Sequence, residues 1–365
     1  MERNTLRIAI THGDVNGIGY EILLKIFTEP LICELFCPII YGSSVAEKYW
    51  REKLRIEGEP WHLISQASEA HSGRVNLIDV CETDLDIQPG QVSASAGMAA
   101  LAALDRAIKD INRHECDALV TAPINKSAMP ADRFPFKGHT DYLAHCYAKD
   151  PEEALMILFS GECRVALATT HCALKDVPEL LSMDLLVGKL HRMEQSLIQD
   201  FSITKPRIAL LSLNPHASDH GLMGDEEARI LEPAIKLASQ DKILCFGPYA
   251  ADGFWGSDLY SRFDGVLALY HDQGLAPFKT LYMDSGVNFT ANLPIIRTSP
   301  DHGTGYDIVG KGVAQEDSMR AAIYAAIDIC RSRRQFKEAT RSPLRKTFFD
   351  KCSDNEKLEA TESED

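Results

Sequence analysis

The stretch SPDHGTGYDIVGKG, residues 299–312, places four glycines, one His, two Asp and one Lys within fourteen residues. It directly follows the apolar run at 293–296. Because glycine lets the backbone approach a ligand closely and leaves amide groups free to donate, this composition is typical of a loop that wraps a ligand. A Gly-rich surface turn is the alternative interpretation. The residue types favour nucleotide binding, and similar polar segments occur elsewhere in the chain.

The composition is that of a soluble globular protein long enough for two domains. Of 365 residues, 45% are hydrophobic and 25% charged, and no run of about 18 apolar residues could span a membrane. The N-terminal MERNTLRIAIT lacks the apolar region and cleavage site of a signal peptide. The ten cysteines are scattered without a CxxC pair, which fits a reducing compartment. We therefore expect a cytoplasmic protein with no membrane partner.

The formal net charge of −15 argues against a nucleic-acid partner, which would need a concentrated basic face. An acidic protein that handles an anionic substrate must gather positive charge locally. Five basic residues lie in or beside the Gly-rich motifs: Lys126, Lys137, Lys279, Arg297 and Lys311.

Strand-like and helix-like segments alternate along the chain, which predicts an α/β architecture with helices on both faces of the sheet. The expected strands are 6–11, 38–41, 75–79, 118–121, 154–159, 165–170, 207–213 and 265–270. The expected helices are 19–27, a helix after Ser43, 95–112, 183–200, 225–240 and 318–331.

Short polar segments follow five of the expected strands. They are GDVNGIG at 13–19, TAPINK at 121–126, TTH at 169–171, NPH at 214–216 and YHDQG at 270–274. In open α/β sheets, ligands bind outside the carboxyl ends of the strands. These loops are therefore expected to converge on one cleft.

Three of these segments carry a histidine: His171, His216 and His271. Imidazole is a common ligand of divalent metals, and three protein ligands with one open position form the usual catalytic arrangement. With 12 histidines in the chain, ordinary hydrogen-bonded histidines are the alternative.

Longer motifs around these residues closely resemble the 4-hydroxythreonine-4-phosphate dehydrogenase family of vitamin B6 synthesis. They are GHTDYLA at 138–144, ATTHCALKDVP around His171, NPHASDHGLMGDEE around His216, YHDQGLAPFK around His271, and NFTANLPIIRTSPDHGTGYDIVGKG at 288–312. The last motif also resembles the HGxxxDIxGKG loop of the isocitrate and isopropylmalate dehydrogenase superfamily, which holds the adenosine end of a nicotinamide cofactor.

The resemblance implies an isocitrate/isopropylmalate dehydrogenase-like fold of two α/β/α domains with a cleft between them. The first domain would be discontinuous, built from residues 1–125 and 290–346 with the cofactor loop at 302–312. The second, residues 126–289, would form the metal and dimer side. Residues 347–365 form an acidic tail that we expect to be disordered. The family also implies a homodimer whose metal site borrows from the second subunit.

The resemblance further implies roles for individual residues. A divalent metal (Zn, Mg or Co) would be held by His171, His216 and His271. The substrate would contact His139, Thr140, Lys279, Asn288 and Arg297, and NAD would contact His302, Gly303, Asp307 and Lys311. Candidates for proton transfer are Lys279, Asp252 and His139, among which the sequence does not choose.

The implied reaction is the metal-dependent oxidation of 4-phosphooxy-L-threonine by NAD to a β-keto acid, which decarboxylates to 3-amino-2-oxopropyl phosphate. An acidic Asp307 at the ribose favours NAD over NADP, although Lys311 could pair with the extra phosphate. Alternatives are a same-fold dehydrogenase of 4-phospho-threonate or 4-phospho-erythronate, a non-catalytic binding protein, and a metal-dependent hydrolase.

Two departures from the family pattern lie in these motifs. His12 and Asn16 stand where the family usually has Pro, and Ser218-Asp219-His220 replaces the common Gly-Glu-Gly. We expect them to affect substrate specificity rather than the metal and substrate residues themselves.

Overall fold

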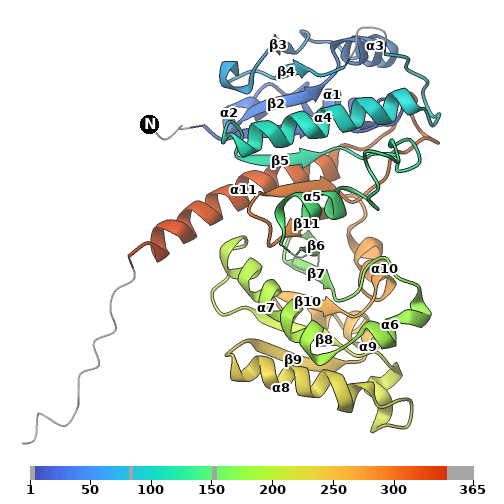
Figure 1. The fold of residues 1–365 in the computed structure, drawn as a ribbon, viewed down its shortest axis with the longest axis vertical. Helices are drawn as coiled ribbons and strands as arrows, with labels where there is room; N and C mark the ends of the chain where they lie inside the picture. The colour runs from blue at the N-terminus through green and yellow to red at the C-terminus, as the bar shows by residue number, and fades with distance from the viewer. Residues whose placement is uncertain (1–4, 82–84, 150–153, 343–365) are drawn as a thin grey trace, which may run out of the picture.

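The computed structural model describes residues 5–81, 85–149 and 154–342. Within these ranges the strands form one twelve-stranded sheet in the order β3-β4-β2-β1-β5-β12-β11-β6-β7-β10-β8-β9. Figure 1 shows an elongated molecule, with the N-terminal strands at one end and β8, β9 and α8 at the other. β11 and β12, the last two strands in chain order, lie in the middle of the sheet.

The first half of the sheet is parallel throughout. Its strands, in chain order, are β1 (Arg7–Thr11), β2 (Cys37–Gly42), β3 (His62–Ile64), β4 (Asn76–Asp79), β5 (Ala118–Thr121) and β12 (Arg297–Pro300). Because β12 pairs with β5, the chain returns to its N-terminal strands after residue 290. The domain boundaries drawn from the sequence remain a prediction.

Helices cover both faces of this parallel half, as the alternation of side chains along β1 requires. Ile8 and Ile10 join the core cluster that contains residues of α1 (Gly19–Ile26) and α11 (Asp317–Thr340). Ala9 joins the opposite cluster with the apolar side of α4 (Ala94–Asn112). Together, the two clusters shield both faces of these parallel strands from water.

The second half of the sheet is mixed. β6 (Leu155–Ser160) is antiparallel to both β7 (Cys163–Leu167) and β11 (Val287–Ala291), whereas the remaining strands are parallel. Those strands are β8 (Arg207–Leu211), β9 (Leu244–Tyr249) and β10 (Gly265–Ala268). The helices around this half include α5 (His139–Tyr147), α7 (Met183–Gln199), α8 (Glu232–Gln240) and α10 (His271–Tyr282).

The predicted α/β class is confirmed, and each expected strand and helix has a counterpart that overlaps it. Two helices differ in extent. The segment predicted as one helix at 225–240 contains a π-helical turn, Glu227–Leu231, before α8. α11 continues to Thr340, well beyond the predicted end at residue 331. The predicted acidic tail, residues 347–365, lies outside the described residues.

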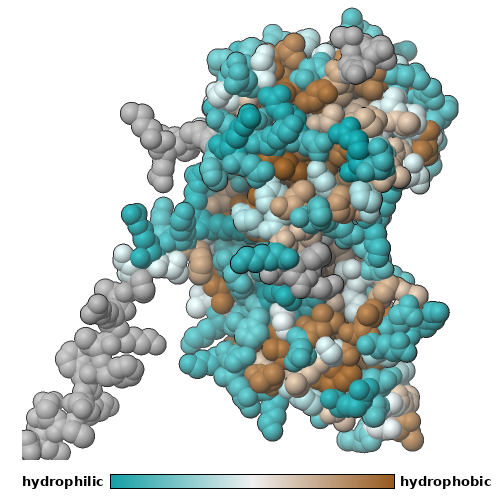
Figure 2. Space-filling model, in the orientation of Figure 1, coloured by the Kyte–Doolittle hydropathy of each residue, from teal (hydrophilic) through white to brown (hydrophobic). Residues whose placement is uncertain are grey.

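Most of the surface in Figure 2 is hydrophilic, with hydrophobic side chains gathered in small groups. In the segment around α6 (Val177–Leu180), Leu174, Leu180 and Met183 are exposed. None of the described helices combines the length and the apolar character needed to cross a membrane.

Candidate active site

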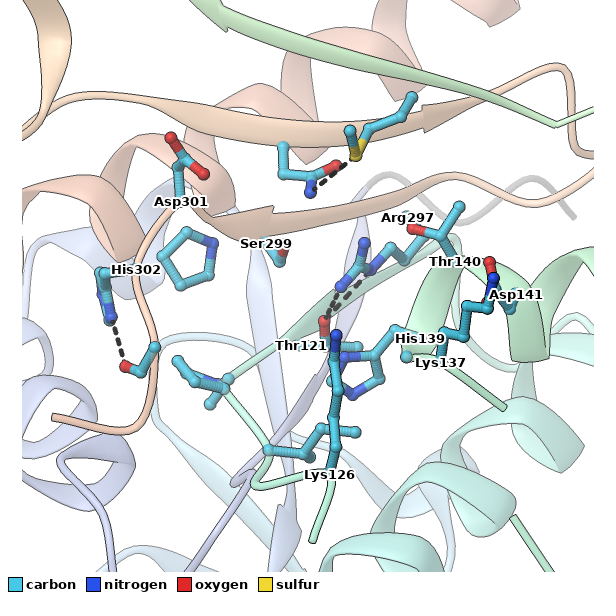
Figure 3. Close-up of a pocket in the computed structure, with 18 of the residues that line it drawn as sticks. Thr121, Lys126, Lys137, His139, Thr140, Asp141, Arg297, Ser299, Asp301 and His302 are labelled. Atoms are coloured by element: carbon cyan, nitrogen blue, oxygen red, sulfur yellow. Dashed lines mark hydrogen bonds between the residues drawn. The ribbon is translucent and has the colours of Figure 1, made fainter. Parts of the chain in front are cut away.

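A cavity of about 420 Å³ lies where β5 and β12 end, against α5, α10 and β11. Eight of the residues predicted from the sequence line it, and Figure 3 shows several of them converging from different elements. These eight are His139, Thr140, His171, Lys279, Asn288, Arg297, His302 and Gly303. The expected convergence of strand-end loops therefore holds for the loops after β5 and β7, joined by residues of α5, α10, β11 and β12.

Arg297, the first residue of β12, contributes a buried positive charge to this cavity. Its side chain is 3% exposed, and it donates hydrogen bonds to the hydroxyls of Thr121 and Thr290. No carboxylate among the described residues forms an ion pair with it. Burial lowers the pKa of Arg297 to about 9, which reflects the cost of a charge without a counter-ion. Three of its five N–H donors are used within the protein, so two are left for a ligand.

His139, at the first position of α5, lies beside Arg297 in Figure 3. Burial and the positive charges of Arg297 and Lys126 lower the pKa of His139 well below its ordinary value. Its imidazole is therefore neutral near pH 7, and the same causes make it a weaker base than an exposed histidine. Thr140, the next residue, lies 3.5 Å from the Thr290 hydroxyl, oxygen to oxygen.

Lys279, in the last turn of α10, is held by Asp301. Its Nζ lies 3.0 Å from Asp301 Oδ1 and donates to the Asp301 carbonyl at 3.3 Å. Burial raises the pKa of Asp301, although Lys279 opposes that rise. Asn288 lies on the same wall, with its amide oxygen buried and lacking a hydrogen-bond partner among the described residues.

Two of the three predicted metal ligands are neighbours. The rings of His171 and His271 have centroids 6.4 Å apart, and burial together with Lys126 lowers the pKa of His171, which favours the neutral form that binds metals. His271 Nδ1 also contacts Asp272 at 2.7 Å, a partner typical of metal-bound histidines. Two neighbouring imidazoles suit a divalent metal. Across the described part of the chain, however, no three His, Cys, Asp or Glu side chains gather closely enough to hold one.

His216 occupies a loop after β8 whose backbone is unusual. His216, Ala217, Ser218, Asp219 and His220 all have left-handed φ values between 46° and 65°. Such conformations cost energy for residues other than glycine, and the family's common Gly-Glu-Gly would lower that cost at two of these positions. The residues just before this loop are held in place, because the backbone amides of Leu213 and Asn214 donate hydrogen bonds to buried Glu227.

The loop at 302–312 reaches the cavity with its first two residues, His302 and Gly303. Burial lowers the pKa of His302, and its Nε2 is buried without a partner among the described residues. Asp307 and Lys311 are exposed and do not line the cavity. Their assignment to the cofactor remains a prediction.

Two further residues lie away from the cavity. Asp252 is exposed in the first turn of α9 (Ala251–Gly256) and does not line it. His12, one of the departures from the family pattern, is fully buried in the core, with Nε2 3.3 Å from the Ala99 carbonyl oxygen. The substitution at position 12 therefore does not reach the cavity wall.

Thr121, Thr290 and Asp301 are the residues that sequence reasoning missed. The two threonines orient Arg297, and Asp301 holds Lys279. Threonine in a strand carries no chemical signal of its own. Asp301 was visible within the quoted loop, since it precedes His302 where β12 ends.

Comparisons with known proteins point to one family. A family model described as pyridoxal phosphate biosynthetic protein PdxA matches residues 34–326. A 4-hydroxythreonine-4-phosphate dehydrogenase of Bacteroides thetaiotaomicron is 48% identical over 358 residues, or 98% of each chain. One from Prosthecochloris aestuarii is 43% identical, over 89% of this chain and 97% of its own.

Solved structures give the same result. The crystal structure of a 4-hydroxythreonine-4-phosphate dehydrogenase from Klebsiella pneumoniae superposes with a TM-score of 0.79 at 32% identity. The match covers 90% of this chain and 99% of that one.

Proposed function

Because the chain belongs to the 4-hydroxythreonine-4-phosphate dehydrogenase family, we propose that it oxidises 4-phosphooxy-L-threonine in pyridoxal phosphate biosynthesis. The secondary alcohol loses a hydride to NAD and its hydroxyl proton to a base. The resulting β-keto acid then loses carbon dioxide and leaves 3-amino-2-oxopropyl phosphate.

The observation that carries this proposal is the buried Arg297 without a carboxylate partner among the described residues. Lys126, Lys137 and Lys279 line the same cavity, and Asp141 and Asp301 are its acidic residues. The excess of positive charge favours a ligand with several negative charges, such as a phosphate and a carboxylate on one small molecule. Arg297 can bind such a group through its two remaining N–H donors.

Of the three candidates for proton transfer, His139 fits best. It lines the cavity and is neutral near pH 7, whereas Asp252 is exposed elsewhere. Lys279, held at two points by Asp301, suits a fixed cationic contact with the substrate. His139 would thus accept the hydroxyl proton while Arg297 and Lys279 hold the anionic groups.

A divalent metal would be held by His171, His216 and His271. When bound, it would polarise the substrate oxygen as a Lewis acid. Only His171 and His271 are neighbours within one chain, and this supports a site completed in a homodimer. The exposed Leu174, Leu180 and Met183 supply apolar area for such an interface.

The remaining parts of the proposal are the cofactor and the compartment. NAD would lie with its adenosine end on the loop at 302–312, reached through His302 and Gly303. No disulfide joins the described cysteines, which supports a reducing cytoplasm.

The test is NADH formation by the purified protein with a divalent metal and separate substrates. We expect turnover with 4-phosphooxy-L-threonine and at least tenfold lower kcat/KM with 4-phospho-erythronate, which lacks the amino group. A preference for the erythronate would replace the proposed substrate by the alternative one. The absence of turnover with any phosphorylated hydroxy acid would contradict the proposal.

A further inference from the structure

The side chain of Tyr306 ties the loop at 302–312 to two other loops. Its hydroxyl donates a hydrogen bond to Asp14 Oδ2, in the loop after β1. The side chain of Asn125, in the loop after β5, also hydrogen-bonds this hydroxyl. One phenol thus joins three strand-end loops at a single point.

Asp14 is a fixed acceptor for this bond. It is 2% exposed, its amide donates to the Pro123 carbonyl at 2.9 Å, and its Oδ1 accepts from the Asn16 amide at 2.9 Å. No basic side chain among residues 5–81, 85–149 and 154–342 forms an ion pair with it. Burial raises the pKa of Asp14, and the bond from Tyr306 opposes that rise. The charged form of this buried carboxylate is therefore stabilised by groups that donate hydrogen bonds to it, such as the Asn16 amide and the Tyr306 hydroxyl.

The backbones of the two Gly-rich loops touch beside this bond. The Ile18 amide donates to the Thr304 carbonyl at 3.0 Å. A Cβ on Gly17 would lie 2.7 Å from the Thr304 oxygen, and one on Gly305 would lie 2.9 Å from Ile18 Cδ1. Gly305 also has a φ of +57°. Glycine is required at both positions by this close approach.

The loop that holds Asp14 is itself anchored. The side chain of Asn16 accepts from the Gln88 amide at 2.8 Å and donates to the Gln91 carbonyl at 2.9 Å. The Gly90 amide donates to the Asn16 carbonyl at 2.8 Å. Tyr306 is therefore hydrogen-bonded to a loop that is itself held by several hydrogen bonds. Gly303 and Gly312, towards the two ends of the loop at 302–312, have open space around them.

We propose that Tyr306 is a positioning residue for the nicotinamide nucleotide, acting through its hydrogen bond to Asp14. The bond holds residues 302–307 in one arrangement before the nucleotide binds, so that binding need not order the loop. This inference rests on the proposed function, because it assumes that the loop binds the nucleotide. It assigns no contact between Tyr306 and the substrate.

The test is a double-mutant cycle of Tyr306→Phe and Asp14→Ala, with the Kd of NADH measured by fluorescence. We expect Tyr306→Phe to raise this Kd and the KM of NAD about tenfold, with kcat and the KM of the phosphorylated substrate within about twofold of wild type. The double variant should bind little worse than either single variant, since all three lack the same bond. Tyr324→Phe, at an exposed position on α11, is the matched control.

Hydrogen exchange of the backbone amides of residues 302–308 gives a second readout that does not need the cofactor. Faster exchange in Tyr306→Phe, with an unchanged Tm, is the expected result. If wild type binds NADH and Tyr306→Phe binds it equally well, the positioning role is wrong while the proposed function stands. If wild type binds no nicotinamide nucleotide, the proposed function fails and the nucleotide role of Tyr306 fails with it.

Discussion

Arg297 donates two hydrogen bonds to one hydroxyl, from Nε and Nη2 to Thr121 Oγ1 at 3.1 and 2.7 Å. Thr290 accepts a third, from Nη1 at 3.3 Å. Neutral hydroxyls therefore fix the plane of the guanidinium without neutralising it. The charge stays available to an anion that enters the cavity, and its orientation is set in advance.

Arg297→Lys should weaken substrate binding although it keeps the charge. Lysine lacks the planar fork and cannot reproduce the three bonds to the two threonines. We expect KM for the phosphorylated substrate to rise at least about 30-fold, within the roughly 2–5 kcal/mol expected for a buried charged contact.

Thr121→Val, which removes only the hydroxyl acceptor, should raise the same KM by a smaller factor of several-fold. Thr280→Val, at an exposed position on α10, is the control. Steady-state kinetics that found Arg297→Lys equal to wild type would remove Arg297 from the substrate site.

Lys279→Ala and Asp301→Asn should have opposite effects on KM. Loss of Lys279 removes a positive charge from the cavity and should raise KM for the anionic substrate about tenfold or more. Asp301→Asn removes a negative charge, so KM should fall or stay the same. Its kcat should drop about tenfold because the ion pair that orients Lys279 is lost. An unchanged kcat in Asp301→Asn would show that Asp301 does not act through Lys279.

The parts of the fold that the sequence predicts best are those with continuous apolar runs. Ala118–Thr121 was predicted with its exact bounds, because ALVT is buried throughout and a polar loop follows it at once. β12 was missed, since RTSP reads as a polar connection and not as a strand. Pairing with β5 and β11 and packing against α11 bury Arg297 and its neighbours.

The same limit applies to the candidate site. Long motifs identified His139, Lys279 and Arg297, which carry charge or a titratable ring. Thr121 and Thr290 lie 169 residues apart in the sequence (290 − 121), and their shared role depends on strand order. The position of His216 relative to the other two histidines likewise depends on how separate loops are arranged in space, which no local pattern encodes.

His12 should make the stability of the protein fall at mildly acidic pH. Burial lowers the pKa of this fully buried histidine to about 4, below its ordinary 6.5. A lowered pKa means that the unfolded state binds the proton more tightly. The contribution of neutral His12 to the stability of the folded state is therefore complete above pH 6.5, and it is lost as the pH falls towards 4.

From pH 7 to pH 5 the free energy of unfolding should decrease by about 2 kcal/mol from this group. Urea unfolding at both pH values checks the expectation, with His12→Gln as the variant and His145→Gln, at an exposed histidine, as the control. A wild-type decrease that persists unchanged in His12→Gln would assign the effect to other groups.

The predicted metal should depend on all three histidines. His171→Ala, His216→Ala and His271→Ala are each expected to reduce the bound divalent metal per chain at least tenfold, as measured by elemental analysis after gel filtration. Removal of the metal by chelator should abolish turnover, and added metal should restore it. If His216→Ala retained full metal content, the ligand set would be limited to the neighbouring pair His171 and His271.

The preference for NAD over NADP should depend on Asp307. This carboxylate is exposed in the loop at 302–312, and near the ribose it would accept hydrogen bonds from hydroxyls and repel a 2′-phosphate. Lys311 is also exposed and would attract that phosphate once Asp307 is gone. Asp307→Ala should therefore lower kcat/KM with NAD and raise it with NADP, changing their ratio at least tenfold, whereas Lys311→Ala should increase the preference for NAD. Kinetics with both cofactors measure the ratio. A wild-type preference for NADP would contradict the cofactor assignment, and an unchanged ratio in Asp307→Ala would show that this carboxylate does not face the ribose.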